Sequence, residues 1–379
     1  MNDRRLPSPE EVGGALAEHL RQLGPSGQWQ HGRTVKVLST EDLSPGLGQA
    51  TVLRVSADLG DGGPASWIAK LPAGGNQSLL ELSDPALTER ETRFFGSPLR
   101  GILPDGLATA PDAGALRHGG SEWIFMRDIG EAMDRRWTVA DAHLVAARLA
   151  RLHAPVTADP GVLATPWLER NGYAGYAHHV PAGHENLELL GQDERLAGLF
   201  SPEQVRRLHG CLAALGRLTA VADGLTPTLL HGDLHLRNLG LTADRTLVLI
   251  DWEHVGVGPV GVDLATFVSL YRLFGGEGEP DERALLAEYG TALSEIAGRD
   301  LRRDAELGFA VCHLTWGLHL RLGPGLTAVR QGVFDGSADA LSAHLEDVRS
   351  GALRALFWAT ELGIGEAGTG ELRTGKEDS

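Results

Sequence analysis

The chain is 379 residues long, 42% hydrophobic and 22% charged, with a formal net charge of −16. This length is enough to bury a sizeable core, and it indicates two domains or one large unit with two lobes. The negative charge opposes phosphate backbones and anionic lipid, so neither nucleic acid nor a membrane surface is an expected partner.

The sequence contains no long apolar run of the kind that spans a bilayer, and MNDRRLPSPEEV at its start lacks the apolar core of a signal peptide. A cytoplasmic protein is therefore expected. Cys211 and Cys312 are far apart and form no C-x-x-C pair, which argues against a cysteine-ligated zinc site. Both are expected to be buried thiols in a reducing compartment.

A helix is predicted from Ser8 onward, because Ser8 and Glu11 can form a capping box and Pro9 suits the first helical position. Residues 33–43 and 50–72 alternate and are β-branched, with a turn at 61–63, which predicts an antiparallel sheet.

A helical stretch is predicted at 84–99, and residues 114–130 predict a second hairpin that turns at His118, Gly119 and Gly120. Helical patterns follow at 138–154 and 201–222. In this later part the strong strand signals are confined to a hairpin at 239–251. Residues 302–322 have the apolar spacing of a packed helix. We expect a nucleotide-binding lobe at 1–127, a mainly helical lobe at 128–361 and a disordered tail at 362–379.

The densest polar chemistry lies in LLHGDLHLRN, residues 229–238, between a predicted helix and a predicted hairpin. In an extended segment, His231, Asp233 and His235 would point the same way and could bind a hydrolytic metal. Buried histidines that only hydrogen-bond the backbone are the plainer alternative.

Downstream residues favour a third interpretation. Asn238 follows Asp233 by five positions (238 − 233), and Asp251 follows it by 18 (251 − 233), at a strand end of the hairpin. Phosphoryl transfer needs such a set, because one carboxylate orients the acceptor hydroxyl while an amide and a second carboxylate hold magnesium.

HGDLHLRN and IDWEHVGVGPVGVDLA, with AARLARLHA upstream, resemble the aminoglycoside phosphotransferase and choline kinase family. The resemblance implies an α+β, protein-kinase-like fold with a small antiparallel-sheet lobe and a mainly helical lobe. It also implies that Lys70 in SWIAKLP holds the α and β phosphates and pairs with Glu91, with Glu89 as the second choice.

By the same resemblance, Asp233 is the catalytic base, and Asn238 and Asp251 bind Mg²⁺. His231 anchors the catalytic loop, and Asp263 braces that loop by hydrogen bonds.

The family's nucleotide loop would lie at Gly46 and Gly48, although glycine-rich turns are usually only turns. Adenine would contact the backbone near Phe125 to Asp128, including Met126.

The sequence departs from the commoner family pattern in the catalytic loop. Leu236 and Arg237 stand where the family often has proline and glycine, and His235 stands where protein kinases have lysine. His235 or Arg237 could then contact the transferred phosphate, or Arg237 could pair with an acidic neighbour.

The expected activity is transfer of the γ-phosphate of ATP, or of GTP, to a hydroxyl of an antibiotic, sugar, amino alcohol or secondary metabolite by a monomer or homodimer. The chain has no evident activation segment between IDWEH and GVDLA, so a protein substrate is less expected. The alternatives are a metal hydrolase built on His231, Asp233 and His235, and a kinase-like protein that binds nucleotide without turnover.

Overall fold

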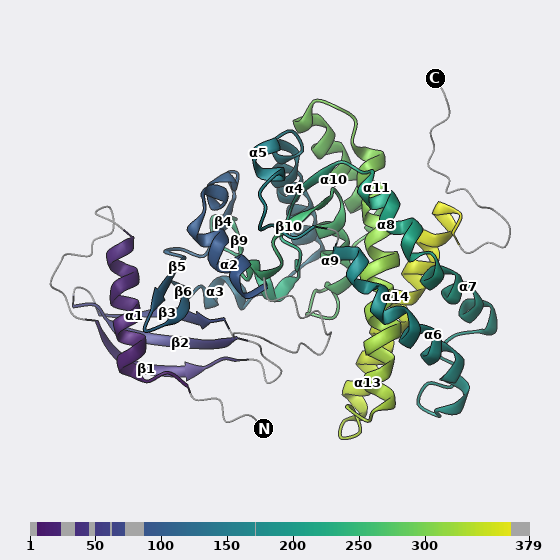
Figure 1. Ribbon diagram of the computed structural model, residues 1–379, viewed down its shortest axis with the longest axis horizontal. Helices are drawn as coiled ribbons and strands as arrows, with labels where there is room; N and C mark the ends of the chain where they lie inside the picture. Colours follow the sequence, from purple (N-terminus) through teal and green to yellow (C-terminus); the bar gives the residue numbers. More distant parts are fainter. Residues whose placement is uncertain are drawn as a thin grey trace. The chain divides into compact units, whose positions relative to one another are not determined.

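The computed structural model divides into two compact units, residues 1–135 with 237–255 and residues 136–236 with 256–379 (Figure 1). The residues that it describes are 6–23, 35–44, 50–60, 63–72, 87–170 and 172–364. The first unit is built around antiparallel strands and the second is mainly helical, so the predicted α+β class is confirmed.

The first unit contains a five-stranded antiparallel sheet in the order β1-β2-β3-β6-β5. Its strands are β1 (Lys36–Asp42), β2 (Thr51–Asp58), β3 (Pro64–Leu71), β5 (Gly114–His118) and β6 (Ser121–Arg127). Alternate residues of β2 are buried, as the period of a strand with one covered face requires.

Helix α1 (Pro9–Gln22) packs on the sheet of the first unit. The predicted capping box is present, because the Glu11 amide donates to Ser8 Oγ at 3.2 Å and the Ser8 amide donates to the Glu11 carboxylate at 2.7 Å. Val12 and Leu16 are fully buried with Trp67 and Phe125 of the sheet. The helix therefore closes the core of this unit.

The β5–β6 hairpin turns at Gly119 and Gly120, as predicted. His118 pairs with Ser121, and both glycines have positive φ, 60° and 86°. A two-residue turn with positive φ at both positions matches the twist of the flanking strands, which is why two glycines are needed.

A second sheet of the first unit has the order β4-β9-β8. Its strands are β4 (Leu107–Thr109), β8 (Leu239–Leu241) and β9 (Leu247–Leu249). The β8–β9 hairpin was expected at 239–251, but within the helical part of the chain. Because β9 pairs in parallel with β4, the hairpin belongs instead to the first unit. The unit also contains α2 (Leu87–Gly96), η1 (Pro98–Ile102) and α3 (Gly130–Met133).

Helices make up most of the second unit. The longer ones are α4 (Val139–Val156), α6 (Val180–Leu189), α7 (Pro202–Ala213), α8 (Leu215–Asp223), α9 (Val262–Leu270), α10 (Glu282–Ala297), α11 (Arg302–Cys312) and α14 (Ala338–Leu362). The shorter ones are α5 (Pro160–Leu163), η2 (Gly172–His179), η3 (Leu190–Gln192), α12 (Leu318–Leu320) and α13 (Leu326–Arg330). Helices α4 and α10 pack together, and every residue of α9 is buried.

Two features of this unit differ from the sequence-based expectation. Strands β7 (Pro227–Leu230) and β10 (Gly256–Pro259) form an antiparallel pair that was not predicted. The single helix predicted at 302–322 ends at Cys312 and continues as π-helical turns η6 (His313–Gly317) and η7 (Arg321–Gly325), with α12 between them. π-Helical turns are rare and often occur at functional sites.

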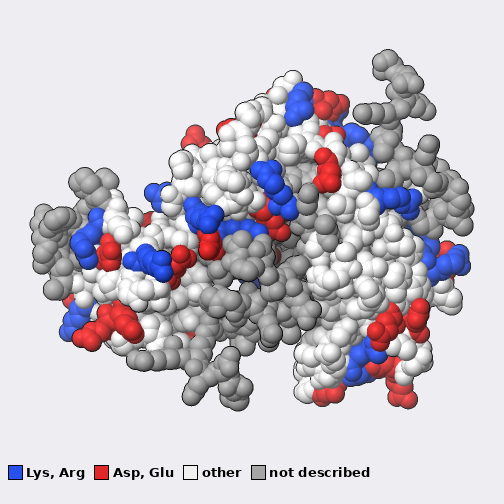
Figure 2. All heavy atoms as spheres, viewed as in Figure 1, with Lys and Arg blue, Asp and Glu red and all other residues white. Residues whose placement is uncertain are grey.

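Basic and acidic side chains lie beside one another on the described part of the face in Figure 2. Exposed ion pairs join some of the charged side chains of the described residues; in one of them, Arg302 lies 2.7 Å from Asp300. None of the described helices is long and apolar enough to cross a membrane. Within the predicted tail, Leu362 ends α14 and Ile364 is buried, while 365–379 lie outside the described residues.

Candidate active site

The first unit contains a buried ion pair between Lys70 and Glu91. Lys70 lies near the end of β3, the strand between β2 and β6, and its Nζ is 2.6 Å from the Glu91 carboxylate of α2. Lys70 is 8% exposed and Glu91 is 1% exposed. Glu89 instead pairs with Arg93 on the exposed side of α2, at 2.6 Å. Of the two glutamates considered from the sequence, Glu91 is therefore the partner of Lys70.

The same lysine contacts two further carboxylates. Its Nζ lies 2.6 Å from Asp251, which directly precedes η5 (Trp252–His254), and 3.4 Å from Glu253, which lies within η5. Between them, the Trp252 indole stacks on Phe94 of α2, with ring centroids 4.1 Å apart. The Trp252 amide donates to Glu91 at 3.3 Å. These contacts fix η5 against α2.

Asp251 has a left-handed backbone, with φ of 64° and ψ of 67°. Aspartate is enriched among the few non-glycine residues that adopt this conformation. The conformation costs free energy and is retained where the surrounding structure over-determines it, commonly at functional sites. Asp251 lies two residues after the end of β9 and directly precedes η5, which carries Glu253.

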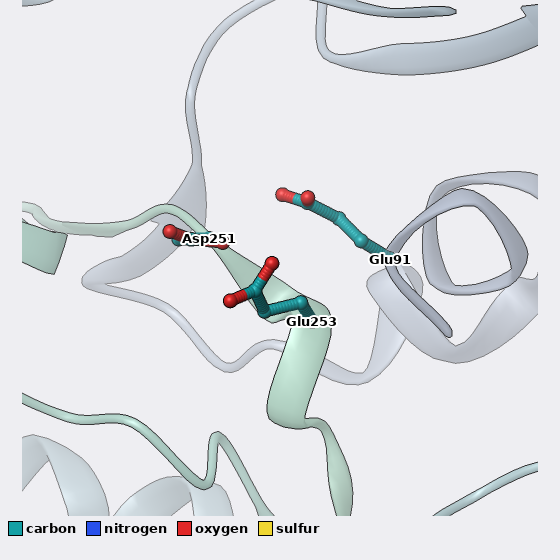
Figure 3. Close-up of side chains that lie close together, drawn as sticks. All are labelled: Glu91, Asp251 and Glu253. Atoms are coloured by element: carbon teal, nitrogen blue, oxygen red, sulfur yellow. The ribbon is translucent and has the colours of Figure 1, made fainter. Parts of the chain in front are cut away.

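Figure 3 shows the three carboxylates of Glu91, Asp251 and Glu253, which reach one region from α2 and η5. One oxygen of each lies within 4.8 Å of the others. One ammonium against three carboxylates leaves an excess of two negative charges if all are ionised. Hard divalent cations choose carboxylate oxygens. The cluster can therefore accept a cation such as Mg²⁺.

The charges also shift the ionisation of both members of the ion pair. Burial alone would lower the pKa of Lys70, but the charges of Asp251, Glu91 and Glu253 outweigh it and raise that pKa well above its ordinary value. Burial raises the pKa of Glu91 to about 7, against the opposing effect of Lys70, with Asp251 and Glu253 adding to the rise. Lys70 is therefore a permanent cation, and Glu91 is a carboxylate that positive charge would stabilise.

Asn238 lies beside the start of the β8–β9 hairpin, which ends before Asp251. The Ile250 amide donates to the Asn238 carbonyl at 3.1 Å, one step beyond the Leu239–Leu249 pair of the hairpin. Asn238 is 6% exposed. The predicted juxtaposition of Asn238 with the Asp251 segment across the hairpin is thus present in the first unit.

In the second unit, Asp263 at the start of α9 holds the loop that follows β7. Its carboxylate accepts hydrogen bonds from the His231 amide at 2.8 Å and the Gly232 amide at 3.0 Å. His153 Nε2 lies 3.4 Å from the same carboxylate. These are the bracing hydrogen bonds expected from the sequence. Gly232 has φ of 83°, which suits glycine and lets both amides face one carboxylate.

Asp233 and His235 lie further along this loop. His235 Nε2 is 3.4 Å from the Asp233 carboxylate, and the His235 ring packs on Phe274 at 4.4 Å. The loop is not an extended strand, so the shared direction assumed for His231, Asp233 and His235 does not apply. Among the described residues, the group of three suitable metal ligands is Glu91, Asp251 and Glu253.

The remaining predicted nucleotide contacts lie partly outside the described structure. Gly46 and Gly48 are outside the described residues. Met126 pairs with Ile68 in the sheet, and the Asp128 amide donates to the Ser66 carbonyl at 3.2 Å. The Asp128 carboxylate accepts from Arg54 at 2.9 Å and from Ser66 Oγ at 2.8 Å. The Asp128 side chain therefore secures the end of β6. Arg237, which was considered for contact with the transferred phosphate, is exposed.

Glu253 and the aromatic row of η2, Tyr173 and Tyr176 with His179, were not predicted from the sequence. Glu253 could have been noticed, because DWE places a second carboxylate two residues after Asp251. The row on η2 had no comparable signal, since residues three apart share a face only once the segment is known to be 3₁₀-helical.

Comparisons with known proteins agree with this geometry. A model described as phosphotransferase enzyme family matches residues 113–307, just over half of the chain. A choline kinase from Cryptosporidium parvum Iowa II is similar in structure, with a TM-score of 0.54, 12% identity and coverage of 94% of this chain and 97% of that one. An aminoglycoside phosphotransferase from Alicyclobacillus acidocaldarius has a TM-score of 0.50 and 11% identity, and the match covers 95% and 97% of the two chains. No curated protein matches the chain in sequence. At these identities the structural likeness shows the fold, which is the predicted protein-kinase-like one.

Proposed function

Because this chain belongs to the phosphotransferase enzyme family, we propose that it transfers the γ-phosphate of ATP, with GTP as the alternative donor, to a hydroxyl group of a small molecule. The observation that carries the proposal is the buried Lys70–Glu91 ion pair with Asp251 beside it. Kinase-like phosphoryl transfer needs a strand lysine held by a helix glutamate, together with an aspartate for the metal.

Lys70 binds the phosphates of the nucleotide in this proposal, and Glu91 orients its ammonium group. The pair is almost completely buried, so the lysine has little freedom to take another position. A cation that is fixed before the substrate binds stabilises charge on the phosphates without reorganising in the reaction.

Asp251 and Asn238 would hold Mg²⁺, and Glu253 is a further carboxylate within reach of the same ion. When bound, the ion neutralises charge on the phosphates and orients them. Asp251 lies on a backbone fixed by η5, while Asn238 is fixed by its hydrogen bond to Ile250. The protein supplies these oxygens at the two ends of one hairpin.

Asp233 accepts the proton of the acceptor hydroxyl in this scheme. Its loop is held by hydrogen bonds from the His231 and Gly232 amides to the Asp263 carboxylate, so the backbone of the two residues that precede Asp233 is fixed. The hydroxyl oxygen forms a bond to the γ-phosphorus, the bond to the leaving ADP oxygen breaks, and the hydroxyl proton passes to Asp233.

The role of Lys70 can be tested directly. In Lys70→Ala, kcat/KM for ATP should fall on the order of a hundredfold, because a fixed positive charge is removed from the phosphates. Adenosine binding should change little, since it has no phosphate. The matched control is Lys36→Ala, which removes an exposed lysine from β1 of the same sheet. ATP kinetics unchanged by Lys70→Ala would contradict the proposed function.

The two alternatives make different predictions. Turnover that needs Mg²⁺ or Mn²⁺ together with ATP is expected here. Zinc-dependent hydrolysis without nucleotide would favour a metal hydrolase at His231, Asp233 and His235. A protein that binds ATP tightly but transfers phosphate to no hydroxyl compound would be the non-catalytic alternative. The complete set of Lys70, Asp233, Asn238 and Asp251 argues against that alternative.

A further inference from the structure

The 3₁₀-helix η2 of the second unit aligns Tyr173, Tyr176 and His179 on one face. A 3₁₀-helix has three residues per turn, so side chains three positions apart lie above one another. The rings of Tyr176 and His179 confirm this alignment, with centroids 6.5 Å apart and an interplanar angle of 26°. We call Tyr173, Tyr176 and His179 the η2 row.

The η2 row begins near the loop that carries Asp233. Glu169, four residues before Tyr173, bridges Gly256, and Gly256 pairs with Leu230 at the end of β7, three residues before Asp233. Burial, the Cys312 thiol, and the charges of Glu169 and Asp233 raise the pKa of Tyr176 well above its ordinary value. The Tyr176 phenol therefore keeps its proton and can donate a hydrogen bond. The Tyr173 hydroxyl is buried and has no hydrogen-bond partner among the described residues.

The other end of the row also has unused hydrogen-bonding capacity. His179 is 7% exposed, and its Nε2 has no partner within the described part of the chain. His319 of α12 is fully buried, and neither of its ring nitrogens has a partner there. Buried polar groups are normally paired, so a set of unpaired ones indicates a missing polar ligand or water. Their position beside the π-helical turns η6 and η7 agrees with a functional site.

His179 and His319 are uncharged at neutral pH. Burial, with the neighbouring His178, lowers the pKa of His179 to about 4. Burial, with His179, His178 and His184, lowers the pKa of His319 to about 4. The nearby guanidinium of Arg321 is neutralised by Asp347 at 2.8 Å.

We propose that the η2 row, with His319 behind it, holds the acceptor, and that the acceptor is an uncharged sugar or glycoside. The proposal rests on the function proposed above and specifies the acceptor of that reaction. Phenol and imidazole groups offer both donors and acceptors to hydroxyl groups, and their rings offer apolar faces to the C–H groups of a sugar ring. A polycationic acceptor would instead need several carboxylates. The row itself contains none, and the carboxylates whose charges act on Tyr176 are Glu169 and Asp233, of which Asp233 is assigned as the base.

The length of the row agrees with this class of ligand. Each turn of a 3₁₀-helix rises about 6 Å, so Tyr176 and His179 are separated along the axis by roughly the width of one sugar ring. A ligand whose reactive hydroxyl lies at Asp233 would contact Tyr176 first and His179 with its next ring. His319 is fully buried, so we assign it no direct contact with the ligand.

The acceptor class can be tested by ATP consumption against glucose, maltose, methyl glucoside, choline and kanamycin. We expect turnover with an uncharged member, and kcat/KM at least tenfold lower for choline and kanamycin. Preference for choline or kanamycin would overturn the inference while leaving the proposed function intact, and so would absence of turnover with every uncharged member. If the proposed function itself is wrong, a different result is expected, because Lys70→Ala would then leave ATP binding unaltered.

The residues can be tested with the best uncharged acceptor of that panel. Tyr176→Phe removes only a hydroxyl, and His179→Leu removes both ring nitrogens, so each should raise the KM for the acceptor about tenfold without changing the KM for ATP. His179→Gln should restore part of the loss. The matched control is His143→Gln, at a half-exposed histidine of α4 that pairs with Glu288. An unchanged acceptor KM in both Tyr176→Phe and His179→Leu would overturn the assignment of the row.

Discussion

Asp263 shows how a single buried carboxylate can position a loop. It is fully buried, and burial alone would raise its pKa. The hydrogen bond and charge of His153, with the contribution of His231, outweigh burial and lower that pKa below its ordinary value. The carboxylate therefore stays ionised and holds two loop amides. His153 is itself held by the Tyr289 hydroxyl at 2.8 Å, so the brace extends from α9 through α4 to α10.

Asp233→Asn separates catalysis from binding. If Asp233 accepts the hydroxyl proton, it acts mainly in the transition state, so kcat should fall on the order of a hundred to ten thousand fold. The affinity for Mg-ATP, measured by calorimetry, should stay close to that of the parent. A variant that keeps most of its rate would exclude Asp233 as the base. Loss of Mg-ATP affinity instead would identify it as a metal ligand.

Glu253→Gln tests the carboxylate that the sequence analysis did not predict. Its oxygen lies with those of Glu91 and Asp251, and the substitution removes one negative charge of this cluster while preserving its shape. The Mg²⁺ concentration that gives half-maximal turnover should rise by about threefold or more, since hard cations prefer charged oxygen ligands. Glu89→Gln is the matched control, because Glu89 lies on the exposed face of α2. Equal Mg²⁺ requirements in the two variants would show that Glu253 contacts Lys70 but does not contribute to Mg²⁺ binding.

At the scale of single elements, α4 illustrates local sequence control. Thr138 Oγ1 accepts from the Asp141 amide at 3.4 Å, and the Thr138 amide donates to the Asp141 carboxylate at 3.0 Å. This capping box satisfies amides that the first turn of a helix leaves unpaired. Because α4 packs along α10 and carries His153, its first turn affects the elements that hold the Asp233 loop.

Thr138→Ala should therefore lower the free energy of unfolding by about 1 kcal/mol, within the usual range for loss of a capping side chain. Chemical denaturation measures this change. Thr138→Ser keeps the hydroxyl and serves as the control, with a loss well below that of the alanine variant. If serine and alanine destabilise the protein equally, the methyl group of Thr138 contributes through packing, and the cap contributes little.

Local patterns predicted several elements of the fold, while features that depend on long-range contacts were missed. The capping box at Ser8 and the turn at Gly119–Gly120 are confirmed, because each is determined by residues within a few positions. Strands β7 and β10 are four residues each and contain proline or glycine, so they show no strand period. The β8–β9 hairpin was predicted, but its parallel pairing with β4 joins segments more than a hundred residues apart.

The same distinction applies to the candidate site. Motif spacing singled out Asn238 and Asp251, and the family resemblance implied Lys70 and Glu91. The structure brings Lys70, Glu91 and Asp251 into contact. Their catalytic roles remain predictions. The η2 row could not be inferred, because a Tyr-x-x-Tyr-x-x-His pattern shares a face only in a 3₁₀-helix. The π-helical turns beside His319 were likewise hidden, because their apolar spacing resembles that of an ordinary helix.

At the scale of the whole molecule, buried neutral histidines connect stability to pH in both units. In the first unit, His19 is 2% exposed, and burial lowers its pKa although its Nε2 lies 2.8 Å from the Asp112 carbonyl. In the second unit, burial lowers the pKa of His313 well below its ordinary value, and those of His179 and His319 to about 4. Each of these groups releases its proton more readily in the folded protein than in the unfolded chain.

The sign of the effect follows from proton binding. Between a folded pKa of about 4 and an unfolded value of 6.5, the unfolded chain binds more protons than the folded protein, so stability falls as the pH drops through that window. For His319 alone the loss at pH 5 is about 2 kcal/mol relative to pH 7.5. A second effect opposes it, because acidification also reduces the net charge of −16 and with it the repulsion among carboxylates.

A histidine variant separates these two effects. His319→Leu keeps an apolar side chain in the buried position but cannot take up a proton, so the difference in unfolding free energy between pH 7.5 and pH 5 should shift by about 2 kcal/mol relative to the parent, toward greater stability at pH 5. Urea denaturation at both pH values measures this difference, and it does so whether or not the substitution also changes stability at pH 7.5. His143→Gln, at a half-exposed histidine of α4, should leave the difference close to that of the parent. If His319→Leu has the same pH dependence as the parent, His319 does not titrate on unfolding, and the acid sensitivity of the protein must come from its carboxylates.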